Sequence, residues 1–299
     1  MSMRREALEK LRVDPKEKFV LADHSPSWLP AEMAAMDKKS RKKLAEQMLK
    51  DNRTELAQAQ DLLYADDRFS MLLIFQAMDA AGKDGTIKHV MSGINPQGCS
   101  VTSFKVPSTE ELDHNFMWRY TNALPPRGNI GIFNRSYYEE VLVVRVHPGI
   151  LEKQRLPDGP RGKAFWKERY DDINAFERHL VRNGTVVLKF FLNISKEEQK
   201  ARFIDRLDVQ EKNWKFSAGD VRERRYWDDY QKCFEEAIDA TSTEWAPWWV
   251  IPADDKSAMR AAVSDIVTTT VKGMDLRYPE VPAEEIAKLA EARAELEAE

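Results

Sequence analysis

The sequence has few of the features that mark secreted and membrane proteins. Only two cysteines, Cys99 and Cys233, occur among 299 residues, so no disulfide framework is expected and a reducing compartment is favoured. No apolar run approaches the length that crosses a bilayer, and the first residues, MSMRREALEK, contain no apolar stretch of the kind found in signal peptides. We therefore expect a cytoplasmic protein with no membrane partner.

The chain also lacks a strong excess of either charge. It carries 46 lysines and arginines against 50 aspartates and glutamates, which gives a net charge of −4. A general nucleic-acid binder needs a basic excess, so we expect no nucleic-acid partner. The five histidines show no metal-ligand spacing. The basic run KKSRKK at 38–43 is interpreted as a solvated helix face.

Short apolar runs alternate with helical patterns along the chain. The runs typical of buried strands are residues 71–75, 100–104, 129–133, 185–192 and 248–252. The stretches with helical periodicity are residues 36–64, 108–120, 163–183 and 254–272. The alternation predicts an α/β fold with a doubly wound, mainly parallel five-stranded sheet and helices on both faces.

No convincing linker interrupts the chain, so we expect one domain over residues 1–299. Its expected parts are an N-terminal arm and helix (1–66), a core (67–209 and 231–275), a helical lid (210–230) and a C-terminal tail (276–299). Prolines keep the arm irregular up to about residue 35, and Trp28 and Leu29 are expected to anchor it. The acidic tail predicts a surface helix over 283–299.

A phosphate-binding loop is predicted within SMLLIFQAMDAAGKDGTIKHV, residues 70–90. A buried strand leads into small residues, then Lys83 and a helix start, so backbone amides and a helix N-terminus meet the phosphates. The residues expected to bind phosphate here are Ala80, Ala81, Gly82, Lys83, Asp84 and Gly85. The alternative is a buried strand followed by an alanine-rich turn and an exposed lysine.

The loop departs from the usual pattern G-x-x-x-x-G-K-[ST] at two positions. Ala77 occupies the first glycine position, and Asp84 occupies the position of the final hydroxyl. Because that hydroxyl normally binds Mg²⁺, the metal must be held differently. Asp79 and Asp84 supply carboxylates, which suit a hard cation.

A second chemical stretch, NRSYYEEVLVVRVHP, follows the third predicted strand. The carboxyl ends of parallel strands share one edge of a sheet, so Asn134 and Arg135 should face the phosphate loop. Arg135 can bridge phosphates bidentately, and Glu139 and Glu140 can hold Mg²⁺ directly or through water. The alternative is a helix start whose acidic residues favour its dipole.

The stretch 210–230 is the natural lid, because it mixes aromatic and basic residues between two helices. Its cations are Lys212, Lys215, Arg222, Arg224 and Arg225. A mobile arginine stabilises the charge of phosphoryl transfer. The alternative is an exposed connector whose arginines pair with the nearby carboxylates of Asp220, Glu223, Asp228 and Asp229.

Five stretches in order resemble the family-2 polyphosphate kinases, which are P-loop enzymes with a thymidylate-kinase-like core. They are residues 75–90, 104–120, 131–148, 211–230 and 241–256, and the resemblance extends from residue 44 to 279. The unusual phosphate loop is similar to the family's own form, D-A-A-G-K followed by an acidic residue or glycine and then glycine.

The resemblance implies phosphoryl transfer between inorganic polyphosphate and a nucleotide, with Mg²⁺, or Mn²⁺ as an alternative ion. It implies catalytic roles for Asp79, Lys83, Arg135 and Arg224, and metal binding by Asp79 and Glu139. Further residues expected to bind phosphate or nucleotide are Arg119, Asn134, Glu140, Arg145 and Lys215. Arg145 would have to fold back to join the others.

The form NRSYYEE resembles the branch that uses AMP or ADP as acceptor, so adenine or guanine nucleotides are the expected partners. Many members have aspartate where this chain has Asn134, so we expect Glu139 to bind the metal instead. A homo-oligomer, a dimer or a tetramer, is also expected. Two alternatives stay open: an ATP-dependent nucleoside monophosphate kinase, and a regulator that binds nucleotide or polyphosphate without turnover.

Overall fold

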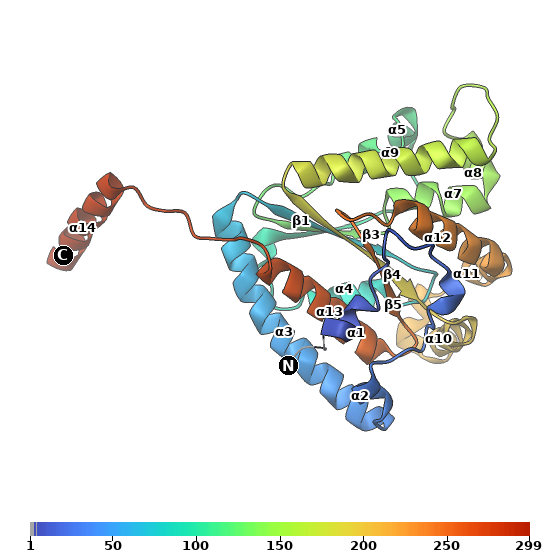
Figure 1. The fold of residues 1–299 in the computed structure, drawn as a ribbon, viewed down its shortest axis with the longest axis horizontal. Helices are drawn as coiled ribbons and strands as arrows, with labels where there is room; N and C mark the ends of the chain where they lie inside the picture. The colour runs from blue at the N-terminus through green and yellow to red at the C-terminus, as the bar shows by residue number, and fades with distance from the viewer. Residues whose placement is uncertain (1–2, 4) are drawn as a thin grey trace.

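The computed structural model describes residue 3 and residues 5–299, with a five-stranded sheet at the centre (Figure 1). The strands are β1 (Ser70–Gln76), β2 (Cys99–Ser103), β3 (Ile130–Asn134), β4 (Thr185–Asn193) and β5 (Trp248–Pro252). They run in the order β2-β3-β1-β4-β5, and each neighbouring pair is parallel. The predicted α/β class and parallel sheet are confirmed.

Strand β1 lies at the centre of the sheet and every one of its residues is buried. It pairs with β3 on one side and with β4 on the other. The chain therefore builds the sheet outward in both directions from β1, which makes the carboxyl end of β1 the point where the strand order reverses. Open α/β sheets bind ligands at this point, and the predicted phosphate loop begins there.

Helices cover both faces of the sheet, as the alternating pattern predicted (Figure 1). On one face α3 (Lys38–Asp66) and α4 (Lys83–Val90) pack against α13 (Lys256–Lys272). The other face carries α9 (Lys163–Arg182), which contacts β4 and α12 (Trp227–Thr241). Both layers bury apolar stripes against the sheet, which is the main source of stability for such a fold.

The remaining elements connect these layers or lie at the ends of the chain. The other α-helices are α1 (Arg5–Glu9), α2 (Ala31–Ala34), α5 (Thr109–Asp113), α6 (Trp118–Thr121), α7 (Val143–Val146), α8 (Pro148–Glu152), α10 (Lys196–Asp208), α11 (Ala218–Glu223) and α14 (Ala283–Ala298). The 3-10 helices are η1 (Leu21–Asp23), η2 (Pro96–Gly98), η3 (Tyr137–Glu140), η4 (Gln210–Lys215) and η5 (Arg224–Tyr226). None of the helices in the described ranges is both long and apolar enough to cross a bilayer.

The N-terminal arm covers the edge of the sheet at β5. The amide of Val13 donates to the carbonyl of Trp248 at 2.9 Å, and the amide of Val250 donates to the carbonyl of Leu11 at 2.7 Å. Trp28 and Leu29 pack partly buried against the core, as expected. The arm thus satisfies hydrogen-bonding groups that an open edge strand would expose.

The helix predicted over 108–120 is wrong as a continuous element, because the chain forms two short helices there. Ser108 caps α5 with the reciprocal Ser108–Glu111 capping box that its spacing predicted. The side chain of Asn115 then accepts from the amide of Met117 at 3.0 Å. This side-chain turn competes with helical hydrogen bonding and separates α5 from α6.

The C-terminal tail ends in α14, the surface helix that the sequence predicted. An extended segment carries α14 away from the rest of the molecule (Figure 1). Its apolar side chains Ile286, Leu289 and Leu296 are exposed.

Candidate active site

The loop between β1 and α4 has the backbone shape of a tight anion cradle. Gly82 has φ +109° and caps the N-terminus of α4, and Ala80 also has a positive φ, 63°. A side chain at Gly82 would be strained by this φ and would lie 3.3 Å from the methyl group of Met259. Helix α4 then begins at Lys83, so its positive end lies at the loop.

Lys83 lies inside this loop among charges of both signs. Its ammonium group donates to the carbonyl of Ala77 at 2.9 Å. Burial lowers the pKa of Lys83, Arg135 lowers it further, and the carboxylates of Asp79 and Glu139 act in the opposite direction. Lys83 is therefore a partly desolvated cation whose charge a phosphate group would stabilise.

Two side chains of α10 hold the loop from behind. Arg202 Nη1 donates to the carbonyls of Ala80 (3.2 Å) and Ala81 (2.7 Å). Gln199 Nε2 donates to the carbonyl of Asp79 at 2.9 Å. The sequence analysis missed both residues, because they lie far from the loop along the chain. The sequence offered one indication of their role: Gln199 and Arg202 are polar residues three positions apart, on the side of the helix that is buried.

Arg135 follows β3 and faces the phosphate loop, as strand order predicted. Its φ is 65°, and its amide donates to the carbonyl of Phe75 at 3.0 Å. Its guanidinium Nη2 lies 3.2 Å from Asp79 Oδ1, and Nη1 lies 3.8 Å from Glu139 Oε2. Glu139, and Asp79 after it, raise the pKa of Arg135 against the effect of burial. Arg135 is thus a fixed cation between two carboxylates.

Asn134 belongs to the same group of residues and orients Asp84. Its Nδ2 donates to Asp84 Oδ1 at 2.7 Å. The amide nitrogen rather than the oxygen therefore meets the carboxylate, so Asn134 acts here as a donor to Asp84. A metal ion binds oxygen, so the amide in this orientation offers Asp84 a donor and no metal ligand, and metal binding by Glu139 stays a prediction.

Asp79 and Glu139 fit a magnesium ion that takes its other ligands from substrate. In the described part of the chain, no three His, Cys, Asp or Glu side chains are grouped to hold an ion. Mg²⁺ characteristically binds one or two carboxylates and completes its shell with water and phosphate oxygens. Both carboxylates contact Arg135 at the wall of the same cavity. The donor set is thus suited to an ion that arrives with phosphate.

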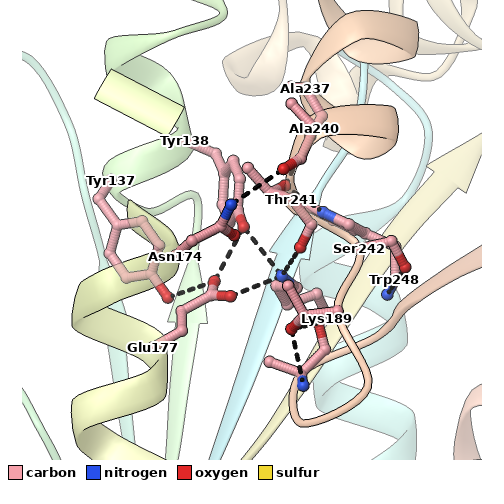
Figure 2. Close-up of polar contacts among 12 residues, drawn as sticks. Tyr137, Tyr138, Asn174, Glu177, Lys189, Ala237, Ala240, Thr241, Ser242 and Trp248 are labelled. Atoms are coloured by element: carbon pink, nitrogen blue, oxygen red, sulfur yellow. Dashed lines mark hydrogen bonds and ion pairs between the residues drawn. The ribbon is translucent and has the colours of Figure 1, made fainter. Parts of the chain in front are cut away.

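A buried polar cluster fixes the segment that carries Arg135 and Glu139 (Figure 2). The phenols of Tyr137 and Tyr138 donate to Glu177 Oε1 at 2.9 and 2.8 Å. Lys189 Nζ lies 2.6 Å from Glu177 Oε2 and donates to the carbonyl of Thr241 at 2.7 Å. The side chains of Glu177 and Lys189 are both fully buried. The phenols of Tyr137 and Tyr138, both carboxylate oxygens of Glu177 and the ammonium group of Lys189 all have partners, which a buried ion pair requires.

A cavity of about 740 Å³ opens beside the loop and is lined by side chains of two kinds. Its charged and polar lining residues include Asp79, Arg135, Glu139, Gln199 and Arg224. Its apolar and aromatic lining residues include Leu142, Val143, Val146, Ile150, Tyr226, Tyr230 and Phe234. An apolar wall with a few convergent charged groups is typical of a small-molecule site.

The predicted lid lines this cavity through residues of α11 and η5. Arg224 Nη1 donates to Gln199 Oε1 at 2.5 Å and to the carbonyl of Lys196 at 3.1 Å. Because Gln199 also binds the carbonyl of Asp79, a hydrogen-bonded chain joins the lid to the phosphate loop. The side chain of Lys215 lies outside the described part of the structure.

The lid carboxylates contact other parts of the molecule instead of the lid arginines. Glu223 Oε2 lies 2.8 Å from His147 Nε2 and accepts from the phenol of Tyr230 at 2.9 Å. Asp220 pairs with Arg206 at 3.5 Å. For Asp220 and Glu223 the alternative interpretation of the lid, in which its carboxylates pair with its own arginines, is therefore wrong, and for Asp228 and Asp229 it stays a prediction.

Arg119 and Glu140 lie outside the main cavity. Arg119 is buried and donates to the carbonyl of Lys105 at 3.0 Å. Glu140 is buried against Arg169, with Oε2 3.3 Å from Nη1. Burial raises the pKa of Glu140, and Arg169 opposes that effect. The two predicted residues share the wall of a smaller cavity of about 80 Å³, so the structure does not bring them to the phosphate loop.

Arg145 does not fold back to join Arg135 either. Its Nη1 donates to the phenol of Tyr170 at 2.8 Å, and its Nη2 lies 2.5 Å from Glu236 Oε2. The guanidinium is thus engaged by α9 and α12, away from the cavity lining. Its predicted contact with phosphate stays a prediction that would need these bonds to break.

Comparisons with known proteins place the chain in a family. The model of the family Polyphosphate kinase 2 matches residues 38–279. The chain belongs to this family. The family match begins at the start of α3 and ends before α14, so it includes the loop, the Arg135 segment and the lid.

Several members of the polyphosphate kinase 2 family are similar over most of their length. An ADP-polyphosphate phosphotransferase of Rhodopseudomonas palustris is 53% identical, over 84% of this chain and 87% of that protein. An AMP/ADP-polyphosphate phosphotransferase of Meiothermus ruber is 43% identical, over 91% and 96%. The crystal structure of Polyphosphate Kinase 2 from Arthrobacter aurescens has a TM-score of 0.83 at 39% identity, covering 95% of this chain and 96% of that one.

Proposed function

We propose that this protein is a kinase that transfers a phosphoryl group between inorganic polyphosphate and AMP or ADP, with Mg²⁺. The observation that carries the proposal is that Arg135 and Arg224 line one cavity, while Lys83 lies beside it on the carbonyl of the lining residue Ala77, in a chain of this family. The names of its relatives, which include ADP and AMP/ADP phosphotransferases, support both acceptors.

In the forward reaction, an oxygen of the acceptor's terminal phosphate attacks the terminal phosphorus of polyphosphate. The new P–O bond forms as the bond to the bridging oxygen breaks, which leaves polyphosphate one unit shorter. AMP thereby becomes ADP, and ADP becomes ATP. The transition state spreads negative charge over the equatorial oxygens, so catalysis consists mainly of positioning and charge stabilisation.

The three cations at and beside the cavity would have different roles in positioning and charge stabilisation. Lys83 and the amides at the start of α4 are placed to bind the transferred phosphoryl group. Arg135, held between Asp79 and Glu139, is placed to contact the phosphates on either side of the breaking bond. Arg224 would bring the lid onto the same group, because it already reaches Gln199 beside the loop. Asp79 and Glu139 would hold Mg²⁺, which neutralises phosphate charge when bound.

The direct test is nucleotide formation from long-chain polyphosphate with AMP or ADP and Mg²⁺. We expect ADP and ATP from the wild-type protein, and loss of both products in Lys83→Ala and Arg135→Ala. Chelation of the metal should abolish the reaction, and Asp79→Asn should raise the Mg²⁺ concentration needed for half-maximal rate.

An ATP-dependent nucleoside monophosphate kinase is the alternative that this assay separates. It predicts ADP from ATP and AMP, and no nucleotide product from polyphosphate. That outcome would refute the polyphosphate proposal. Binding of polyphosphate by the wild type with no turnover in either assay would instead support a non-enzymatic regulator.

A further inference from the structure

His147 lies at a restricted point of the chain, between two short helices. It ends α7, where its amide donates to the carbonyl of Val143 at 2.9 Å, and it immediately precedes α8. Pro148 disfavours a helical conformation for the residue before it and is itself suited to the first position of a helix. The backbone therefore restricts where the imidazole can lie, and His147 lines the main cavity.

The lid reaches His147 through Glu223, the last residue of α11. His147 Nε2 lies 2.8 Å from Glu223 Oε2. The phenol of Tyr230 on α12 donates to the same carboxylate oxygen at 2.9 Å. Burial, and then this hydrogen bond, raise the pKa of Tyr230, so the phenol remains a neutral donor. Because an ionised carboxylate only accepts, His147 carries a proton on Nε2 and donates it.

Aromatic packing adds a second contact between His147 and the lid. Tyr226, the last residue of η5, meets the imidazole edge-on, with the ring centroids 4.7 Å apart. Tyr230 also meets it edge-on, at 6.3 Å. Edge-to-face pairs at such distances are attractive and have a preferred orientation. His147 therefore contacts the lid at Glu223 and at Tyr226, and α12 at Tyr230.

Glu223 and Arg224 are neighbours that hold the lid on two sides. The backbone is helical at both residues, so their side chains diverge by about 100° around the helix axis. Glu223 bonds to His147, whereas Arg224 Nη1 donates to Gln199 on α10. The bond to His147 therefore restricts the position of the turn that carries Arg224.

His147 also connects the lid to the segment that carries Arg135. The chain runs from Arg135 through η3 and α7 to His147. Element η3 is anchored by the buried cluster of Glu177 and Lys189 (Figure 2). Arg135, His147 and Arg224 all line the main cavity. The contact between His147 and the lid therefore ties Arg224 to the same anchored segment that carries Arg135.

We propose that His147 is a positioning residue for the lid: its contact with Glu223 keeps the lid closed and holds Arg224 where phosphoryl transfer needs it. This inference rests on the proposed function, because Arg224 is the residue through which His147 acts. A residue in this role contacts the lid and does not need to contact substrate. Its loss should therefore lower the rate of transfer without weakening the binding of either substrate.

The kinetic test compares His147→Ala with the wild type and with the control His179→Ala, at an exposed histidine of α9. We expect kcat with polyphosphate and ADP to fall on the order of tenfold in His147→Ala, as for loss of a hydrogen bond to a charged group. The KM values for polyphosphate and ADP should stay unchanged, and His179→Ala should match the wild type. His147→Gln, which keeps a donor near the position of Nε2, should recover part of the rate.

Two further variants test whether the effect passes through the lid. Glu223→Ala removes the same bond from the lid side and should reproduce the loss of kcat, so the test does not depend on the folding of His147→Ala. In an Arg224→Ala background, His147→Ala should cause no further loss of kcat, because the residue that it positions is already gone. Additive losses in this double variant would overturn the inference.

Tryptic cleavage of the lid measures its closure without substrate. Arg222 and Arg225 flank Glu223 and are both exposed. Trypsin should cleave there at a rate that follows the open population of the lid, with the sites identified by mass spectrometry. We expect cleavage to be several times faster in His147→Ala and Glu223→Ala than in the wild type, and unchanged in His179→Ala.

Two other outcomes would overturn the inference. One is equal tryptic cleavage of the wild type and both alanine variants. The other is a raised KM for ADP with an unchanged kcat, which would place His147 against the nucleotide instead. Failure of the proposed function would differ from both, since the wild type would then form no nucleotide from polyphosphate, while cleavage of the lid would still report whether His147 holds it closed.

Discussion

Arg224 of the lid and Gln199 of α10 form a hydrogen bond of 2.5 Å. The same glutamine donates to the carbonyl of Asp79 in the phosphate loop, so one side chain is hydrogen-bonded to both the lid and the loop. Arg224 also lines the cavity, where a phosphate would compete with Gln199 for its guanidinium. We therefore expect Arg224 to exchange its bond with Gln199 for a bond with a phosphate of the substrate.

Replacement of Arg224 by alanine should reduce kcat on the order of 10³, because the arginine would stabilise charge in the transition state. The melting temperature should change little, since Arg224 is only half-buried. The neighbouring Arg225→Ala is the matched control, because Arg225 is exposed and does not line the cavity. Equal kcat values for the two variants would exclude a catalytic role for Arg224.

Lys83→Met should abolish activity and yet stabilise the protein at neutral pH. The folded state lowers the pKa of Lys83 below its ordinary value of 10.5, so the charged lysine costs folding free energy at lower pH. This cost begins to fall as the pH rises above the pKa of the folded state, where the folded lysine becomes neutral, and it is gone once the pH exceeds 10.5, where the unfolded lysine is neutral as well. We expect a melting temperature about 2 °C above the wild type at pH 7 and a smaller difference at alkaline pH.

The control for this experiment is Lys88→Met on the same helix, where the side chain is exposed. It should change neither the melting temperature at pH 7 nor its dependence on pH. A melting temperature of Lys83→Met below that of the wild type at pH 7 would contradict the argument.

Asn134→Asp should make stability depend on Mg²⁺. The new carboxylate would replace a donor that now lies 2.7 Å from Asp84 Oδ1, so two like charges would meet. Without the metal we expect the melting temperature to fall by about 2–4 °C, and added Mg²⁺ should restore it by binding both carboxylates. Asn122→Asp, at an exposed position, should respond to neither change. A fall that Mg²⁺ does not reverse would argue against a metal site there.

Glu177→Gln should lower the free energy of unfolding by about 3–5 kcal/mol, because it leaves Lys189 charged and buried without its partner. The double variant with Lys189→Met should recover part of this loss. Urea unfolding measures both, with Glu168→Gln on the exposed side of the same helix as control. A loss no larger than that of the control would contradict the assignment of a buried ion pair.

The features that depend on neighbouring residues could be predicted from the sequence. The apolar run at Met71–Phe75 is buried on both faces, so its composition was sufficient to place the central strand. The order of strands then indicated that Asn134 and Arg135 would face the loop, because parallel strands share one carboxyl edge. The spacing of Ser108 and Glu111 also predicted the capped start of α5.

The features that depend on distant contacts could not be predicted. The apolar periodicity of residues 108–120 continues through Asn115 and so predicted one helix. In the structure the side chain of Asn115 accepts from the amide of Met117, and this local hydrogen bond interrupts the helix. Gln199 and Arg202 reach the loop across more than a hundred residues, and no local pattern announces such a contact. Arg145 illustrates the opposite error, in which a contact is predicted that the structure does not contain. This arginine is near the predicted site in the sequence, but its guanidinium bonds to side chains of α9 and α12.

Arg202 already fixes the carbonyls of Ala80 and Ala81, so the phosphate loop has its shape before any phosphate arrives. A loop that is ordered in advance loses little conformational entropy when it binds. Encounter with a highly charged chain, rather than rearrangement of the loop, would then limit how fast substrate binds. The rate of substrate association would accordingly decrease as added salt screens the charges. The movement of Arg224 away from Gln199 would be a separate step of the cycle, slower than association.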